Sequence, residues 1–149
     1  MFKTLKKRIK NEKGLSLVEL LAVIVILGII SAIAVPAIGS IIENTRDKAI
    51  LSDAAGLLAG AKIAIADGSC GEASNKVIIC SNTVLTEVFE GVLISTDKVS
   101  FNTSTKEYTV TYEELKNIQN TDKFTGGGFT PSATNNTITG NQLTALLGK

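Results

Sequence analysis

The sequence contains no histidine and no tryptophan, only two cysteines and two prolines, and few aromatic residues. Without histidine the chain lacks the commonest general base and the commonest metal ligand in proteins. Serine nucleophiles have no imidazole partner, and two cysteines alone do not complete a zinc site. Aspartates and glutamates are mostly scattered, as on a solvated surface. We therefore predict that the protein is not an enzyme and holds no metal or cofactor.

Charge is unevenly distributed along the 149 residues. Residues 1–14 contain six basic residues and one acidic residue, a net charge of +5, whereas the rest contain nine basic and thirteen acidic residues, a net charge of −4. A basic segment before an apolar run is typical of a membrane flank that stays in the cytoplasm. A nucleic-acid-binding arm is the weaker alternative. The body has no Lys/Arg cluster, and we expect no basic side chains around Tyr108 and Tyr112. We therefore predict that both tyrosines pack in the core and that no direct nucleic-acid site exists.

A long uncharged run follows the basic segment. Between Glu19 and Glu43, 23 consecutive residues, 20–42, carry no formal charge. About 20 mostly apolar residues suffice for a helix to cross a bilayer. The run therefore predicts a transmembrane helix, with a kink at Pro36 where the carbonyl of Ala32 loses its partner.

The helical pattern continues beyond this run but becomes amphipathic. Apolar residues recur at spacings of three and four, which places them on one face. These residues are Ile50, Ala54, Leu57, Ala61 and Ile65. Asp67-Gly68 supplies a stop signal. We predict one helix of about 50 residues, from Leu15 to Ala66, whose second half packs on another part of the chain.

The C-terminal half has the composition of a small β-rich domain. Short segments rich in β-branched residues predict strands at 76–80, 91–95, 98–102 and 106–112, the last two joined as a hairpin. Residues 84–90 predict a short helix capped by Asn82 or Thr83. From Thr121 onward we predict an extended surface tail with at most a helical turn near its end. The fold class is α+β, a long helix on a small antiparallel sheet.

Two general interpretations of the N-terminus leave Glu19 unexplained. A secretory signal peptide would be cleaved after Ala34, because Ala32-Ile33-Ala34 is a small-x-small site. A signal anchor would retain the helix in the membrane with its basic end inside. Both place a carboxylate at the entrance of the apolar segment, where charge is unfavourable.

The segment KGLSLVELLAVIVILGIISAIAVP, residues 13–36, resembles the N-terminal signature of type IV pilins and pseudopilins. The resemblance implies that a prepilin peptidase cuts between Gly14 and Leu15 and methylates the new amine of Leu15. It identifies Glu19 with the glutamate at the fifth mature position and Pro36 with the helix-breaking proline. The family's usual first mature residue is Phe, so Leu15 is a departure.

The resemblance also implies a fold, partners and a location. It divides the chain into a cleaved leader (1–14), a transmembrane and assembly helix (15–42), an amphipathic continuation (43–67) and a β-rich head with an extended tail (68–149). In a filament, Glu19 of one subunit would meet the Leu15 amine of its neighbour. The precursor would lie in the cytoplasmic (inner) membrane. A membrane assembly platform and its ATPase would then assemble it, with or without minor pilins, into an extracellular homopolymer.

Two other functions remain open at this point. One is a pseudopilin of a type II secretion system or of a competence system for DNA uptake, since these share the motif. The other is a secreted binding domain released by cleavage after Ala34.

The two cysteines, Cys70 and Cys80, follow the long helix. Outside the cytoplasm a disulfide is the expected state, and it would link the helix end to the first strand. Two free buried thiols are the alternative.

Overall fold

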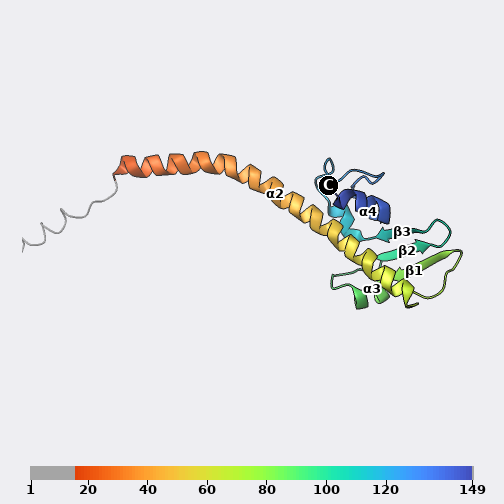
Figure 1. The fold of residues 1–149 in the computed structure, drawn as a ribbon. Coiled ribbons are helices and arrows are strands. Elements are labelled where there is room, and N and C mark those ends of the chain that lie inside the picture. The colour runs from red at the N-terminus through yellow and green to blue at the C-terminus, as the bar shows by residue number, and fades with distance from the viewer. Residues whose placement is uncertain (1–15, 149) are drawn as a thin grey trace, which may run out of the picture. The chain divides into compact units, whose positions relative to one another are not determined.

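Helix α2 (Leu17–Ala66) is a single α-helix of 50 residues, as the sequence predicts. The computed structural model describes residues 16–148. The chain divides into two units, Met1–Ser40 and Ile41–Lys149. The described part of the first unit is the N-terminal part of α2, and all other helices and strands belong to the second unit, the head (Figure 1).

Helix α2 ends at the predicted stop signal. Gly68 has φ +83°, a conformation that glycine adopts without steric cost. The Ser69 N–H donates to Asp67 Oδ1 at 2.9 Å, and hydrogen bonds from the Ser69 side chain and backbone lower the pKa of Asp67. The Cys70 N–H donates back to the Ala64 carbonyl at 3.3 Å. The helix therefore ends here, because the Asp67 carboxylate and the Ala64 carbonyl accept hydrogen bonds from the N–H groups that follow it.

The second half of α2 buries one face against the head. The predicted apolar face is confirmed, since four of its five residues are buried and Ile65 is half-buried against them. The buried residues of α2 are Asp47, Ile50, Leu51, Ala54, Leu57, Leu58, Gly60, Ala61 and Ala64. The burial repeats with the helical period, which is why this half of α2 acts as one wall of the core.

The sheet is a simple antiparallel meander. Its strands are β1 (Val77–Ser81), β2 (Lys98–Asn102), β3 (Glu107–Thr111) and β4 (Thr137–Thr139), in the order β1-β2-β3-β4. One fully buried row crosses all four strands, namely Cys80, Val99, Val110 and Ile138. The row on the other face is mostly Ser and Thr, so a single face of the sheet carries the core. The predicted α+β fold with a small antiparallel sheet is confirmed.

Three short helices complete the head. They are α3 (Asn82–Val88), the 3₁₀ helix η2 (Glu113–Asn117) and α4 (Gly140–Leu147). In Figure 1, α3 lies beside β1, and α4 lies beside β3. The predicted cap of α3 is wrong, because the N-cap residue is Ser81 and it forms no side-chain cap bond. Its hydroxyl instead pairs with the Thr83 hydroxyl at 2.7 Å.

Residues 91–95 do not form the predicted strand. The chain turns instead, and Asp97 holds the turn by accepting a hydrogen bond from the Ile94 N–H at 2.9 Å. Asp97 also accepts from the Glu113 N–H at 2.9 Å and is buried. Val92 is 88 % exposed. A β-branched composition alone does not make a strand where a neighbouring carboxylate captures the backbone N–H.

The C-terminal segment is not an extended surface tail, which corrects the prediction. It contributes β4 and α4, and α4 begins with a reciprocal cap between Thr139 and Gln142. It also contributes five buried side chains to the core, Phe124, Phe129, Ile138, Leu143 and Leu146. The many Thr and Asn residues between these apolar side chains made the segment resemble a loop in the sequence.

Asp47 joins this segment to α2. Its side chain is 0 % exposed. Its carboxylate accepts hydrogen bonds from the Gln119 N–H at 3.1 and 3.2 Å and from the Asn120 N–H at 2.7 Å. Beside it, Asn120 Nδ2 donates to Asn44 Oδ1 at 2.9 Å. The buried charge is therefore satisfied by backbone amides, as burial of a carboxylate requires.

Candidate processing and assembly site

The N-terminal end of α2 is the place where the sequence predicts cleavage and assembly. Gly14 and Leu15 lie outside the described residues, so the description starts at Ser16, directly after the predicted cut. Glu19 lies in the first turn of α2, and its Oε2 accepts a hydrogen bond from the Ser16 N–H at 3.0 Å. The Ser16 hydroxyl accepts from the Val18 N–H at 3.3 Å. These bonds satisfy backbone N–H groups that lack partners at a helix start.

The contact between Ser16 and Glu19 is absent from the sequence prediction, although a signal for it existed. Ser-x-x-Glu before an apolar run is the pattern of a reciprocal helix cap, and SLVE at 16–19 fits it. A carboxylate in the first turn also interacts favourably with the helix dipole. Glu19 therefore has a partner within its own chain before any second subunit is considered.

The first half of α2 presents an almost wholly apolar surface. Residues 16–42 are all exposed except Ala34, which is half-buried. Glu19 is their one charged residue. By length and composition this is a helix that can cross a membrane, and its most apolar stretch is 0 % buried. A soluble monomer seldom exposes an apolar surface of this extent, so the helix requires lipid or other protein around it.

Pro36 and several small residues lie on this surface. Pro36 is inside α2, which continues past it, and the predicted kink stays a prediction. Pro36 has no N–H to donate to the preceding turn. A Cβ at Gly28 or Gly39 would meet nothing within 4 Å in the isolated chain. Such positions let the backbone of a second helix approach closely.

At the other end of α2, Cys70 and Cys80 form a disulfide with Cα atoms 4.7 Å apart. Cys80 is fully buried in β1, and Cys70 packs half-buried against the core. The disulfide therefore ties the chain leaving α2 to the first strand of the sheet. Within residues 16–148 no group of three or more acidic or cysteine side chains is arranged to hold a metal ion.

The two tyrosines differ in their surroundings. Tyr112 is buried, and burial, with the charge of Asp53 next in effect, raises its pKa to about 12. Tyr108 is half-buried, and contrary to the sequence prediction it does have basic neighbours. Lys62 Nζ lies 5.3 Å from the centroid of the Tyr108 ring. Nothing in the sequence indicates this contact, because α2 and β3 are brought together only by the fold.

Comparison with known proteins identifies the N-terminal segment. The family description "prokaryotic N-terminal methylation motif" matches residues 9–35. No curated protein and no solved structure matches the chain. The match spans the predicted cut, Glu19 and the first part of α2, and it agrees with a long apolar helix joined to a small antiparallel sheet. Residues 9–35 therefore carry the N-terminal methylation motif, the class III signal peptide of type IV pilins and pseudopilins.

Proposed function

We propose that the chain is a structural subunit of a type IV pilus-like surface filament, cut between Gly14 and Leu15 and polymerised through α2. The observation that carries the proposal is the exposed apolar half of α2, which bears one carboxylate, Glu19, at its start. In the membrane lipid covers this surface, and in a filament the same helices of neighbouring copies cover it. The role is structural, and the energy for assembly comes from a platform and its ATPase.

Glu19 supplies the specificity of this packing. Cleavage after Gly14 creates a positive amine at Leu15, four residues before Glu19. The same cut removes the +5 leader, which would oppose bundling of the helices. In the filament, the Glu19 carboxylate accepts a hydrogen bond from the Leu15 amine of a neighbouring subunit. This bond either replaces the one from the Ser16 N–H of its own chain or is formed beside it. Loss of one partner from a desolvated ion pair costs about 3–5 kcal/mol, which is enough to select one register.

Two substitutions separate pairing between subunits from capping within one subunit. Glu19→Gln keeps an oxygen that can accept from the Ser16 N–H but removes the charge. Ser16→Ala removes the hydroxyl that accepts from the Val18 N–H but keeps the charge. We expect Glu19→Gln to be cleaved normally and to lose filaments, and Ser16→Ala to be cleaved and to retain them. Normal filament yield from Glu19→Gln would refute the pairing role.

Mass spectrometry of the mature chain tests the processing step. A mature N-terminus at Leu15, with a mass increase for one methyl group, supports the proposal. An N-terminus at Val35 would instead indicate a secreted domain and would contradict it. Labelled imaging of an epitope-tagged chain then distinguishes long surface filaments from the pseudopilin alternative, in which no surface filament forms.

A further inference from the structure

Two lysines from distant parts of the sequence lie beside one groove at the start of the head. Lys48 lies on α2, Lys123 lies in the loop after η2, and both line an open groove of about 270 Å³. Asn120 fixes the loop here, because its side chain donates to Asn44 of α2 and accepts from the Lys123 N–H at 3.1 Å. Lys123 Nζ lies 5.9 Å from the centroid of the Phe124 ring, which attracts the charge without neutralising it. The fold therefore gathers two positive charges on one side of α2.

A second groove adjoins the first and is mostly apolar. Its volume is about 380 Å³, and its lining residues are Ile41, Ile42, Thr45, Arg46 and Ala49. Two of these residues also line the first groove, so the grooves share an edge along α2. Basic and apolar side chains thus form one band around the exposed side of the helix, all within the second unit. This band, called the collar below, consists of Ile41, Ile42, Arg46, Lys48 and Lys123.

No carboxylate neutralises the collar within residues 16–148. None of its three basic side chains forms an ion pair, since the one ion pair in this part of the chain lies within η2. Asp47 is buried, and its carboxylate accepts from backbone amides. Glu43 lies about 140° around the helix from Lys48, and Asp122 lines neither groove. The positive charge of the collar is therefore available to an external anion.

The collar directly follows the segment that can cross a membrane. The uncharged run 20–42 has 23 residues, and about 20 suffice to cross the hydrocarbon, so Ile41 and Ile42 reach its outer edge. Lys48 is about 9 Å further along the helix than Ile42, and the headgroup layer occupies roughly 5–7 Å on each side of the bilayer. Long basic side chains keep their charge at this boundary while their stems cover apolar surface.

We propose that the collar binds anionic phospholipid headgroups in the outer leaflet of the cytoplasmic membrane while the subunit is held there. The inference rests on the membrane stage of the proposed function. The three basic side chains supply charge-assisted hydrogen bonds to phosphate oxygens, and Ile41 and Ile42 contact the acyl chains below them. A leaflet offers many headgroups, so the three charges do not have to converge on one phosphate. Each of them favours an anionic surface about fivefold.

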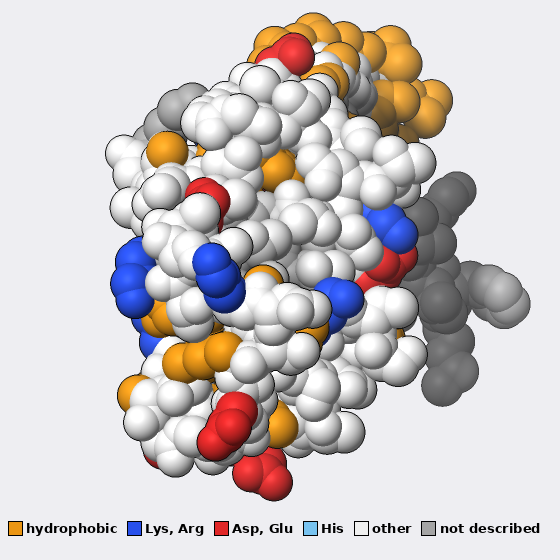
Figure 2. Space-filling model, turned by 90° about the vertical axis from the view of Figure 1, so that its right-hand side faces the viewer, with side chains coloured by type: hydrophobic (Ala, Val, Ile, Leu, Met, Phe, Trp, Pro, Cys, Tyr) orange, Lys and Arg blue, Asp and Glu red, His pale blue; other side chains and the backbone are white. Residues whose placement is uncertain are grey.

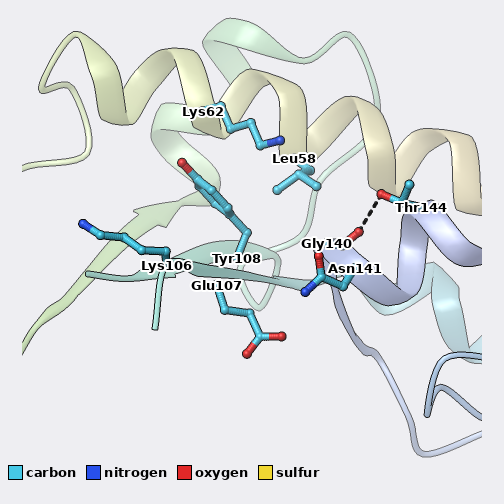
Figure 3. Close-up of a pocket in the computed structure, with 8 residues that line it drawn as sticks. All are labelled: Leu58, Lys62, Lys106, Glu107, Tyr108, Gly140, Asn141 and Thr144. Carbon is cyan, nitrogen blue, oxygen red and sulfur yellow. Dashed lines mark hydrogen bonds between the residues drawn. The ribbon is translucent and has the colours of Figure 1, made fainter. Parts of the chain in front are cut away.

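Basic side chains elsewhere on the head lack this arrangement. Figure 2 shows Lys and Arg side chains scattered over one face, with acidic and hydrophobic side chains among them. In the pocket of Figure 3, Lys62 lies over Tyr108, whereas the Lys106 ammonium points away from Asn141. Lys62 is also about 21 Å further along α2 than Lys48. The lysines of this pocket therefore provide a control with the same charge, away from the collar.

The test uses the ¹⁵N-labelled full chain in lipid nanodiscs, followed by NMR. Nanodiscs of phosphatidylcholine are compared with nanodiscs in which phosphatidylglycerol replaces an increasing fraction of that lipid. We expect saturable shifts of the amides of Thr45, Lys48 and Lys123, and none at Val92, an exposed residue outside the collar. Inorganic phosphate added to the phosphatidylcholine nanodiscs should leave these amides unchanged, which separates a lipid headgroup from the free ion.

Matched variants assign the effect to the collar. Lys48→Gln with Lys123→Gln should raise the phosphatidylglycerol fraction at half-saturation at least about fivefold, read at the Thr45 amide. Lys62→Gln with Lys106→Gln removes the same charge and should leave it unchanged. All four lysines are exposed, so both variants should stay folded. Every variant keeps the basic leader, so any attraction of the leader to phosphatidylglycerol is the same in each.

Three outcomes would overturn the inference and leave the proposed function standing. They are a chain that inserts into phosphatidylcholine but does not respond to phosphatidylglycerol, shifts that inorganic phosphate reproduces, and an unchanged half-saturation point in the collar variant. Shifts that instead grow with the number of chains per nanodisc would assign the collar to a second copy of the chain. A chain that inserts into neither kind of nanodisc would contradict the membrane stage of the proposed function, and this inference with it.

Discussion

The buried carboxylate of Asp47 makes a quantitative prediction about the stability of the head. It is 0 % exposed and accepts hydrogen bonds from the backbone N–H groups of Gln119 and Asn120. Asp47→Ala removes both bonds and leaves a gap. Asp47→Asn keeps one oxygen acceptor and turns an amide NH₂ toward the second N–H. An exposed acid in the same region, Asp122, provides the control Asp122→Asn.

The expected costs follow from the number of bonds lost. A hydrogen bond to a charged group contributes about 1.5–3 kcal/mol. Part of the loss is recovered because the carboxylate no longer has to be desolvated. We therefore expect Asp47→Asn to lower the free energy of unfolding by about 1.5 kcal/mol and Asp47→Ala by about 3 kcal/mol. Asp122→Asn should stay within about 0.5 kcal/mol of the original chain.

Calorimetry of the full chain in detergent measures these differences. For a domain near 100 residues, 1 kcal/mol corresponds to about 4–8 °C in Tm, so Asp47→Ala should melt at least about 12 °C lower. Amide hydrogen exchange gives a local readout, since the amides of Gln119 and Asn120 should lose protection first. Two results would show that the carboxylate does not hold this loop. One is that both Asp47 variants have the same Tm as Asp122→Asn, and the other is that hydrogen exchange at the amides of Gln119 and Asn120 is unchanged.

Three further results are expected. Replacing both cysteines of the disulfide by serine should lower the free energy of unfolding by about 2–3 kcal/mol in guanidinium titrations; a curve identical to that of the oxidised chain would contradict this. Because burial raises the pKa of Tyr112 to about 12, its phenolate absorbance should appear only near pH 12, and the free energy of unfolding should fall as pH rises from about 10 toward 12. A phenolate appearing entirely by pH 10 would refute the burial argument. Gly60→Ala should cost about 1–3 kcal/mol, because the new methyl would lie 2.8 Å from Val88 Cγ2. Gly39→Ala, with nothing within 4 Å, should leave unfolding unchanged.

The helix and most of the sheet could be predicted because their signals are periodic and local. Ile50, Ala54, Leu57 and Ala61 repeat at the helical spacing, and Asp67-Gly68 marks the end of α2. The C-terminal segment escaped prediction for a physical reason. β4 has only three residues, and α4 depends on the cap between Thr139 and Gln142. Neither contains a hydrophobic run, so composition favoured a loop.

The candidate sites divide in the same way. Glu19 was identified because a carboxylate before an apolar run is conspicuous, and its partner Ser16 was within reach of the Ser-x-x-Glu pattern. Asp47 lies three residues before Ile50, on the same face of α2, and this placement was the one available sign of its burial. Nothing in the sequence indicates that Lys62 lies close to Tyr108. The two residues are 46 positions apart, and only the packing of α2 on β3 brings them together.

The order of the strands bears on how the head is made. Each strand of the meander pairs with the strand directly before it in the chain, so pairing never waits for a distant segment. A chain that emerges from a membrane with its N-terminal helix retained can therefore add β1, β2, β3 and β4 one after another, in the order of their release. Asp47 is the exception, because its partners lie 72 and 73 residues downstream. Its carboxylate has no backbone partner until the loop after η2, which carries Gln119 and Asn120, has crossed the membrane. Folding in the order of emergence is therefore complete only when the last third of the chain has left the membrane.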